Sequence, residues 1–390
     1  MHLDPIMPVV VAALLCILII GIILHRLRQP HVVGYLLAGV ILGPHALGLI
    51  EDEAILSRLG AFGVVMLLFF IGMEVSPQRL IANWKVAVIG TFFQIVISVG
   101  CVLALGAWLD WSWSRSILIG FVISLSSTAV VLKILQDWGE LDSNVGQDVL
   151  AVLLAQDLAV IPMLIIIGLL GGAHMSVGAI SLQVIGGILI LGVLIWVVTR
   201  ESINLPFAKW LKGDHEMQIF AALIICFSFA LITGLLGLST ALGAFAAGLL
   251  IGSARETQWV HHSLDSFRVV FIALFFVSIG MLVDIGFLRE HWLLIMALVL
   301  AVLFTNTFLN AIILRLLGDP WSSSLYAGAM LSQIGEFSFV LAAVGFQAQL
   351  INQYGYQLAI EVIAVSLLLS PAWIKLVKHL LGRKSTLHFQ

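Results

Sequence analysis

The chain has 390 residues, of which 61% are hydrophobic and only 10% are charged. Soluble domains carry about 25% charged residues, so this composition, with a mean hydropathy of +1.15, indicates a protein of the lipid bilayer. Eighteen Lys and Arg residues against 21 Asp and Glu residues give a net charge of -3. That balance leaves no basic surplus with which to bind nucleic acid.

The sequence also excludes several kinds of chemistry. Its three cysteines, Cys16, Cys101 and Cys226, lie singly in apolar runs and lack the spacing of a disulfide framework or a zinc site. Neither a G-x-G-x-x-G string nor a P-loop occurs, so no nucleotide or cofactor site is expected. We therefore expect no cofactor, and any transport would be driven by an ion gradient.

Apolar segments long enough to cross a bilayer recur along the whole chain, since a spanning helix needs about 20 apolar residues. We predict thirteen such spans, with boundaries near residues 6–24, 31–50, 59–75, 86–108, 115–134, 147–170, 177–198, 216–234, 238–254, 267–284, 292–316, 322–346 and 357–380. The expected fold is therefore an all-α polytopic membrane protein. Residues 1–380 form one transmembrane domain, and 381–390 form a short cytoplasmic tail.

The positive charges predict the orientation of these spans, because cytoplasmic loops collect Lys and Arg. With the N-terminus outside, fifteen of the Lys and Arg residues fall in inner loops, and only Arg58, Arg115 and Arg289 fall in outer loops. One missed or invented span would reverse every later loop and destroy this asymmetry. We therefore expect the C-terminus to lie in the cytoplasm.

Five acidic residues, Glu74, Asp148, Asp157, Glu336 and Glu361, lie within the predicted spans. A charge at the bilayer centre costs about 2.5–3.5 kcal/mol on insertion scales, so the presence of each of these acidic residues requires a structural or functional explanation. Glu74 and Asp148 lie near helix ends and are expected to be anchors. Asp157 lies near the middle of the sixth span. A neighbouring helix could satisfy it, but a carboxyl group that titrates or binds an ion is the favoured reading.

Two spans carry polar runs at mid-membrane depth. The runs are Ser124, Ser126, Ser127 and Thr128 in the fifth span, and Ser332, Gln333, Gly335, Glu336 and Ser338 in the twelfth. Hydroxyl groups compete for backbone hydrogen bonds and glycine weakens a helix, so both spans are expected to be discontinuous. Because the fifth and twelfth spans are seven crossings apart, they cross the membrane in opposite directions, as an inverted repeat requires. The alternative is that these hydroxyls only join neighbouring helices.

Several motifs together carry a family resemblance. In chain order they are "GYLLAGVILGPHALGL", "LLFFIGMEVSP", "SLSSTAV", "AQDLAVIP", "LGAFAAGLLIG", "LFFVSIGM" and "SQIGEFSFVL". From about residue 10 to 380 the sequence resembles the membrane domain of the monovalent cation:proton antiporter-2 family, in particular its Kef-type potassium/proton members. The Gln-Asp pair of the sixth span and the later "SQIGEF" are the specific motifs.

The resemblance implies an inverted-repeat, NhaA-like antiporter fold with thirteen helices and two crossed discontinuous helices. It also implies a homodimer in a bacterial inner membrane, with a mobile core of spans 4–6 and 11–13 and a scaffold formed by the others. Asp157 matches the family's ion-binding aspartate. Sodium-selective relatives have a second Asp at the position of Gln156, so the resemblance implies K⁺ as the favoured cation, with Na⁺ as the other candidate.

The sequence departs from the family in two respects. Relatives often carry a lysine in the eleventh span where this chain has Asn306, and a neutral amide cannot pair with Asp157 or exchange a proton. Kef-type chains usually continue into a cytosolic nucleotide-binding regulatory domain, for which this sequence has no residues. Gating by glutathione is therefore not expected, although a separate cytosolic regulatory subunit or domain is a candidate partner.

These residues predict a mechanism of competition. Protonated Asp157 is neutral and releases the cation, whereas ionised Asp157 completes a cage with Gln156, the hydroxyl groups of Ser126, Ser127 or Thr128, and freed carbonyl groups. One titrating carboxyl group without a membrane lysine predicts electroneutral exchange. Supporting roles are expected for Ser124, Asn306, Gln333 and Glu336, the last as a brace or a second proton site.

Two other functions compete with this prediction. The alternative from another class is a gated K⁺ efflux pore, which opens to both sides at once. An enzyme would need a nucleophile paired with a base, and the serines near Asp157 have no histidine at matching depth. We therefore expect a transporter rather than an enzyme.

Overall fold

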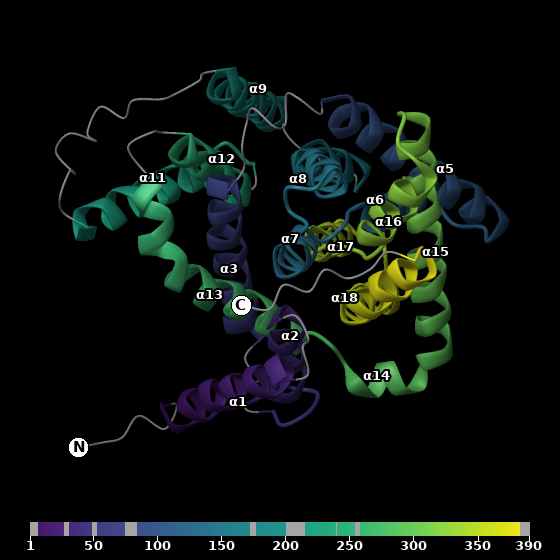
Figure 1. Ribbon diagram of the computed structural model, residues 1–390, viewed down its shortest axis with the longest axis horizontal. Coiled ribbons are helices and arrows are strands. Elements are labelled where there is room, and N and C mark those ends of the chain that lie inside the picture. Colours follow the sequence, from purple (N-terminus) through teal and green to yellow (C-terminus); the bar gives the residue numbers. More distant parts are fainter. Residues whose placement is uncertain are drawn as a thin grey trace. The chain divides into compact units, whose positions relative to one another are not determined.

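The computed structural model describes residues 7–26, 31–48, 53–74, 84–171, 177–199, 215–238, 240–253 and 258–382 (Figure 1). All regular structure in these ranges is helical. The tail predicted for 381–390 lies outside the described residues from 383 onward. The helices are α1 (Met7–Arg26), α2 (His31–Leu42), α3 (Glu53–Glu74), the π-helix η1 (Lys85–Gly90), α5 (Thr91–Trp108), α6 (Trp113–Ser124), α7 (Thr128–Asp137), α8 (Asn144–Leu170), α9 (Val177–Thr199), α11 (His215–Leu235), α12 (Thr240–Gly252), α13 (Gln258–Met281), α14 (Ile285–Glu290), α15 (Trp292–Leu316), α16 (Trp321–Met330), α17 (Phe337–Gln347) and α18 (Gln353–Leu380).

Most helix ends lie within a few residues of the predicted spans, with three differences. The second span was predicted to reach residue 50, but α2 ends at Leu42, because the Gly43-Pro44 pair that follows turns the chain. Helices α3 and α13 begin six and nine residues before the predicted 59 and 267, since polar first turns extend them beyond the apolar run. The short helix α14 was not predicted at all.

Several helices begin at a side chain that caps them. Ser112, Ser143 and Asn352 precede α6, α8 and α18, and each accepts a hydrogen bond from the backbone N–H three residues on, at 2.9–3.3 Å. Such caps satisfy a donor that the first helical turn leaves free. These polar residues therefore fix where the chain re-enters a helix.

Helix α15 shows how polar and apolar faces are distributed. Its Asn306 and Asn310 are buried, whereas Phe304, Phe308 and Ile312 are about half exposed. An apolar outer face with polar residues inside suits a helix surrounded by lipid. Among the described residues, five helices are long and apolar enough to cross a membrane: Lys85–Trp108, Asn144–Leu170, Glu216–Leu235, Trp292–Leu316 and Gln353–Leu380.

The chain divides into two compact units. The first comprises residues 1–51, 83–173 and 279–390, and therefore contains the predicted core spans 4–6 and 11–13 together with α1 and α2. Within it, the half-length helices α6, α7, α16 and α17 lie together, with α8 packed against α16 and α17 (Figure 1). This unit holds all the residues of the predicted site.

The second unit comprises residues 52–82 and 174–278. Its helices α3 and α12 are in direct backbone contact, because Gly248 and Gly252 lie against the carbonyl groups of Phe69 and Met73. A Cβ atom on either glycine would clash with that backbone. Small residues that let helices approach closely are typical of packing in membranes, where lipid replaces water.

Candidate functional site

Two helices of the first unit are interrupted at the polar runs that the sequence singles out. Residues 125–127 separate α6 from α7, and residues 331–336 separate α16 from α17. Serine residues occupy both interruptions and Gly335 lies in the second, in keeping with the tendency of serine to bond to the backbone and of glycine to weaken a helix. Both interruptions lie where the sequence predicts them.

The two interruptions are bonded to each other. The Gly335 N–H donates to the Leu125 carbonyl at 2.7 Å, and the Ser126 hydroxyl donates to the Leu331 carbonyl at 2.7 Å. Gly335 lies so close to Ser126 that a Cβ atom would clash with its carbonyl group. Unpaired backbone groups of one interruption are thus satisfied by the other, and the two form a single polar centre.

Asp157 lies beside this centre on α8 and is partly exposed. The hydroxyl group of Thr128, the first residue of α7, lies 3.2 Å from its Oδ1 and 3.1 Å from its Oδ2. Both carboxylate oxygens therefore face the start of α7. A carboxylate and a hydroxyl group are oxygen ligands of the kind that bind hard cations.

Gln156, the residue before Asp157, is fully buried and turned toward the interruption. Its Oε1 accepts from the Ser126 N–H at 2.9 Å, while its Nε2 donates to the Ser124 carbonyl and to Gln94 Oε1, each at 3.2 Å. Gln94 on α5 donates to the same Ser124 carbonyl at 2.6 Å. The Gln156 amide thus holds the backbone of the interruption in place.

Asn306 joins the two interruptions from α15. Its Nδ2 donates to the Ile123 carbonyl near the end of α6 at 2.9 Å and to the Ser332 carbonyl at 3.2 Å. The side chain is 2% exposed. Asn306 is therefore a neutral, buried residue that binds two carbonyl groups, one at the end of α6 and one in the second interruption.

Glu336 and Gln333 belong to the second interruption, and both are buried. Glu336 precedes α17, whose positive N-terminal end favours a negative charge. The side-chain amide of Gln333 has no hydrogen-bond partner among the described residues, and burying such a group costs free energy.

The other predicted hydroxyl groups have partners in the backbone. Ser124 donates to the Phe121 carbonyl at 2.8 Å, and Ser127 Oγ accepts from the Val130 N–H at 3.3 Å. Together with Ser126, these serines stabilise the ends of α6 and α7. Of the predicted hydroxyl ligands, only Thr128 contacts Asp157 in this conformation.

Gln94 is a residue of the site that was not predicted from the sequence. The available signal was the spacing of Thr91, Gln94 and Ser98, which places three polar residues on one face of an otherwise apolar helix. All three are buried, and the Thr91 hydroxyl lies 3.4 Å from the Val152 carbonyl of α8. That face of α5 is directed toward the site rather than toward lipid.

Comparison with known proteins identifies the family. The model of the transmembrane domain of sodium/hydrogen exchangers matches residues 10–378. The chain belongs to the sodium/hydrogen exchanger family. This exchanger is therefore an integral membrane protein of the cation/proton antiport class and not an enzyme, and the resemblance seen in its motifs is confirmed.

Curated relatives of the exchanger carry different names. It is 38% identical to the iron transporter MagA of Paramagnetospirillum magneticum, over 94% of this chain and 83% of that protein. It is 31% identical to the putative cation/proton antiporter YbaL of Escherichia coli, over 100% of this chain and 71% of that one. For K(+) efflux antiporter 5 of Arabidopsis thaliana the identity is 34%, over 92% and 64% of the two chains.

Solved structures show the fold of the exchanger. The sodium proton antiporter MjNhaP1 of Methanocaldococcus jannaschii at pH 8 matches with a TM-score of 0.72 over 98% of this chain and 99% of that one. The two sequences are only 17% identical. The arrangement of helices in MjNhaP1 is therefore shared, which confirms the antiporter fold predicted from the sequence.

Proposed function

We propose that this chain exchanges one monovalent cation, K⁺ in preference to Na⁺, for one proton at the carboxyl group of Asp157. The observation that carries the proposal is the position of this carboxylate. It lies against the Thr128 hydroxyl at the start of α7, beside the place where two interrupted helices bond to each other. In antiporters with inverted repeats, substrate sites lie at such interruptions.

Competition for one carboxylate couples the two ions. A proton neutralises Asp157 and removes the charge that attracts a cation. A bound cation stabilises the ionised form and so displaces the proton. Each ion therefore excludes the other at the site itself, and no signal from elsewhere in the protein is needed.

The structure supports a division of roles within the predicted cage. Asp157 and Thr128 are the proposed direct ligands, because their oxygen atoms face each other. Gln156, Ser126 and Ser127 are proposed to position the interruption, since their polar groups bond to its backbone or to that of its partner. Backbone carbonyl groups complete the cage when the cation binds.

We propose that exchange is electroneutral. One carboxyl group binds either a proton or a monovalent cation, and Asn306 contributes no charge at the place of the relatives' lysine. Glu336 is assigned the role of a brace at the N-terminal end of α17, where the helix dipole stabilises a carboxylate. The preference for K⁺ is supported by Gln156, which occupies the position of a second acid in sodium-selective relatives.

The predicted topology is part of the proposal. Each of the thirteen predicted spans has a helix among the described residues, with α6 and α7 counted as one crossing and α16 and α17 as another. The outward N-terminus is supported by the distribution of Lys and Arg. The homodimer, the bacterial inner membrane and the elevator movement of the core rest on the family resemblance.

The test is proton flux in proteoliposomes, followed with a pH-sensitive dye in K⁺, Na⁺, Rb⁺ and Li⁺, for the wild type and Asp157→Asn. Fe²⁺ belongs in the series because one relative is named an iron transporter. We expect the substitution to abolish cation-driven proton flux, and Asp142→Asn, which alters an exposed acid outside the site, to leave it unchanged. Normal exchange by Asp157→Asn would overturn the assignment.

The same vesicles separate exchange from a gated pore. An electroneutral exchanger saturates, moves a proton against each cation and runs at the same rate at zero and at about -100 mV. A pore gives single-channel current without alkalinising the opposite side. Turnover that depends on voltage would contradict the proposed stoichiometry.

A further inference from the structure

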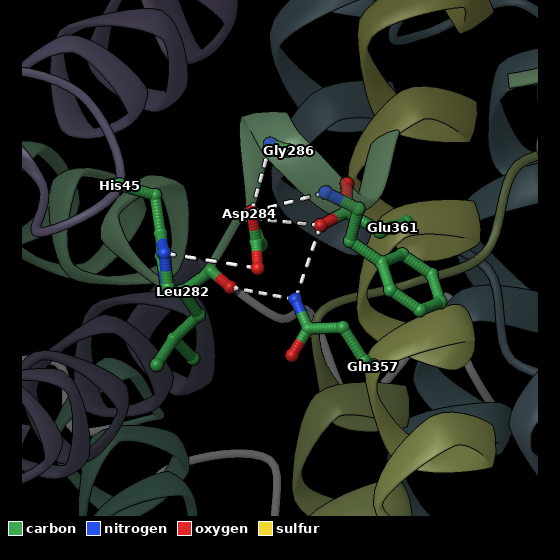
Figure 2. A network of polar contacts seen from close by, with 7 residues as sticks. His45, Leu282, Asp284, Gly286, Gln357 and Glu361 are labelled. Carbon is green, nitrogen blue, oxygen red and sulfur yellow. Dashed lines mark hydrogen bonds and ion pairs between the residues drawn. The ribbon is translucent and has the colours of Figure 1, made fainter. Parts of the chain in front are cut away.

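A second buried carboxyl group lies outside the proposed transport site. Glu361, on α18, is completely buried, although the predicted mechanism gives it no role. It belongs to a polar network with His45, Leu282, Asp284 and Gln357 (Figure 2). The network joins the segment after α2, the connection between α13 and α14, and the first turns of α18. All its members belong to the first compact unit.

The two oxygens of the Glu361 carboxyl group have different surroundings. Oε1 accepts from the Asp284 backbone N–H at 2.7 Å and from Gln357 Nε2 at 3.1 Å, as Figure 2 shows. Gln357 also donates to the Leu282 carbonyl at 3.3 Å. Oε2 is buried and has no hydrogen-bond partner among the described residues.

In contrast to Glu361, both oxygens of the Asp284 carboxyl group have a polar neighbour. Its Oδ1 accepts from the N–H groups of Gly286 and Phe287 at 2.8 and 3.1 Å, and its Oδ2 lies 3.7 Å from His45 Nδ1. The Asp284 side chain is 31% exposed and that of His45 is 40% exposed. Partial exposure and two N–H groups therefore favour a negative charge on Asp284.

We propose that Glu361 is a second proton-binding site, which holds its proton on Oε2 in this conformation. A proton there removes a buried negative charge close to Asp284, while Oε1 remains free to accept both of its hydrogen bonds. A buried neutral hydroxyl group without a partner costs far less than a buried unpaired charge. Loss of the proton would place negative charges on two residues that are in contact, and would weaken the contact between α18 and the α13–α14 connection.

Charged groups on the neighbouring helices do not change this balance. Of the ionisable residues on α15 and α16, Arg315 donates to the Asp319 carbonyl at the far end of α15, and Tyr326 donates to Glu140. Helix α17 has none, and α2 carries only His31 and Tyr35. On α14, Arg289 and Glu290 are exposed. Among the described residues of these elements, Asp284 is thus the charged residue in contact with Glu361, and half-exposed His45 is the partner of Asp284.

Infrared spectroscopy of the purified full chain tests the proposal, because a protonated carboxyl group has a C=O stretching band separate from that of a carboxylate. At neutral pH we expect Glu361→Gln to lose a protonated-carboxyl band that Asp157→Asn retains. Identical absorption in Glu361→Gln and the wild type would overturn the proposal. The result does not depend on transport, so failure of Asp157→Asn to stop exchange would affect only the proposed function.

A second variant keeps the test decisive if Glu361→Gln does not fold. Asp284→Asn retains an oxygen that can cap α14 but removes the neighbouring negative charge. In this variant Glu361 should release its proton at about tenfold higher proton concentration than in the wild type, because a like charge no longer opposes ionisation. The midpoint is read from the pH at which the band disappears, and an unchanged midpoint would count against the proposal.

Discussion

Thr128 is the residue through which the backbone of the interruption and the carboxylate of the site are connected. Its hydroxyl group is within 3.2 Å of both oxygens of Asp157, and its backbone begins α7. A shift of α7 therefore changes the position of an oxygen atom next to Asp157. The position of the N-terminal end of α7 should therefore affect the affinity of the site for the cation.

Removing this hydroxyl group should weaken cation binding. Thr128→Val keeps the branched shape but loses the oxygen. A hydrogen bond to a charged group contributes about 1.5–3 kcal/mol, so the KM for the cation should rise about tenfold or more. Thr128→Ser retains the hydroxyl group and is the matched control. The proposed role would be wrong if both variants had the KM of the wild type in the vesicle assay.

At the scale of elements, the two interruptions form a unit because neither can satisfy its own backbone. Leu125 and Leu331 each supply a carbonyl group to a donor on the other interruption. The Ser338 hydroxyl at the start of α17 adds a third bond, to the Val122 carbonyl of α6 at 2.6 Å. Helices α6 and α17 are thereby held together at the level of the site.

A methyl group between the interruptions should separate them. In Gly335→Ala the new Cβ atom would meet the Ser126 carbonyl, so the Gly335 N–H would be drawn away from Leu125. We expect at least a tenfold loss of exchange and a lower melting temperature in detergent. Gly100→Ala on α5 is the control, because nothing lies within 4 Å of its Cβ position and alanine favours a helix. Equal behaviour of the two variants would contradict this account.

The sequence predicted the interruptions but not their bonding. Runs of hydroxyl residues such as 124–128 indicate locally where a helix is weak, and Asp157 is conspicuous because an acid in an apolar run is costly. Gln156 was expected to be a cation ligand, yet its hydrogen bonds go to backbone groups 30 and 32 residues away. Long-range pairings of this kind depend on the packing of whole helices. Gln94 and Asn306 could be assigned partners only from the fold.

At the scale of the whole molecule, one ion pair joins parts of the chain that are far apart in sequence. Lys378 Nζ lies 2.7 Å from Glu140 Oε1 and 4.4 Å from the centre of the Trp138 ring. Tyr326 donates to the other Glu140 oxygen at 2.7 Å. Residues 238 apart are thus connected, and the segment between α7 and α8 is held against α16 and α18.

Breaking this pair should destabilise the fold without changing the ion that is transported. The Lys378 side chain is 7% exposed and that of Glu140 is 20% exposed, so Lys378→Met leaves a poorly hydrated carboxylate. The expected loss is about 3 kcal/mol, in the range found when one partner of a buried pair is removed. Lys375→Met, at an exposed position of the same helix, should have little effect. Equal unfolding midpoints for the two variants would show that the ion pair contributes nothing.

The glycine contacts between α3 and α12 have a consequence for motion. Helices that touch through side chains can slide, because the side chains change rotamer and fill the space in a new way. Here the backbones themselves are in contact, at Gly248 with Phe69 and at Gly252 with Met73. No rotamer can adjust at these points. When the protein changes conformation during a transport cycle, α3 and α12 should therefore move together as one rigid body. Any bending should occur at the ends of these two helices.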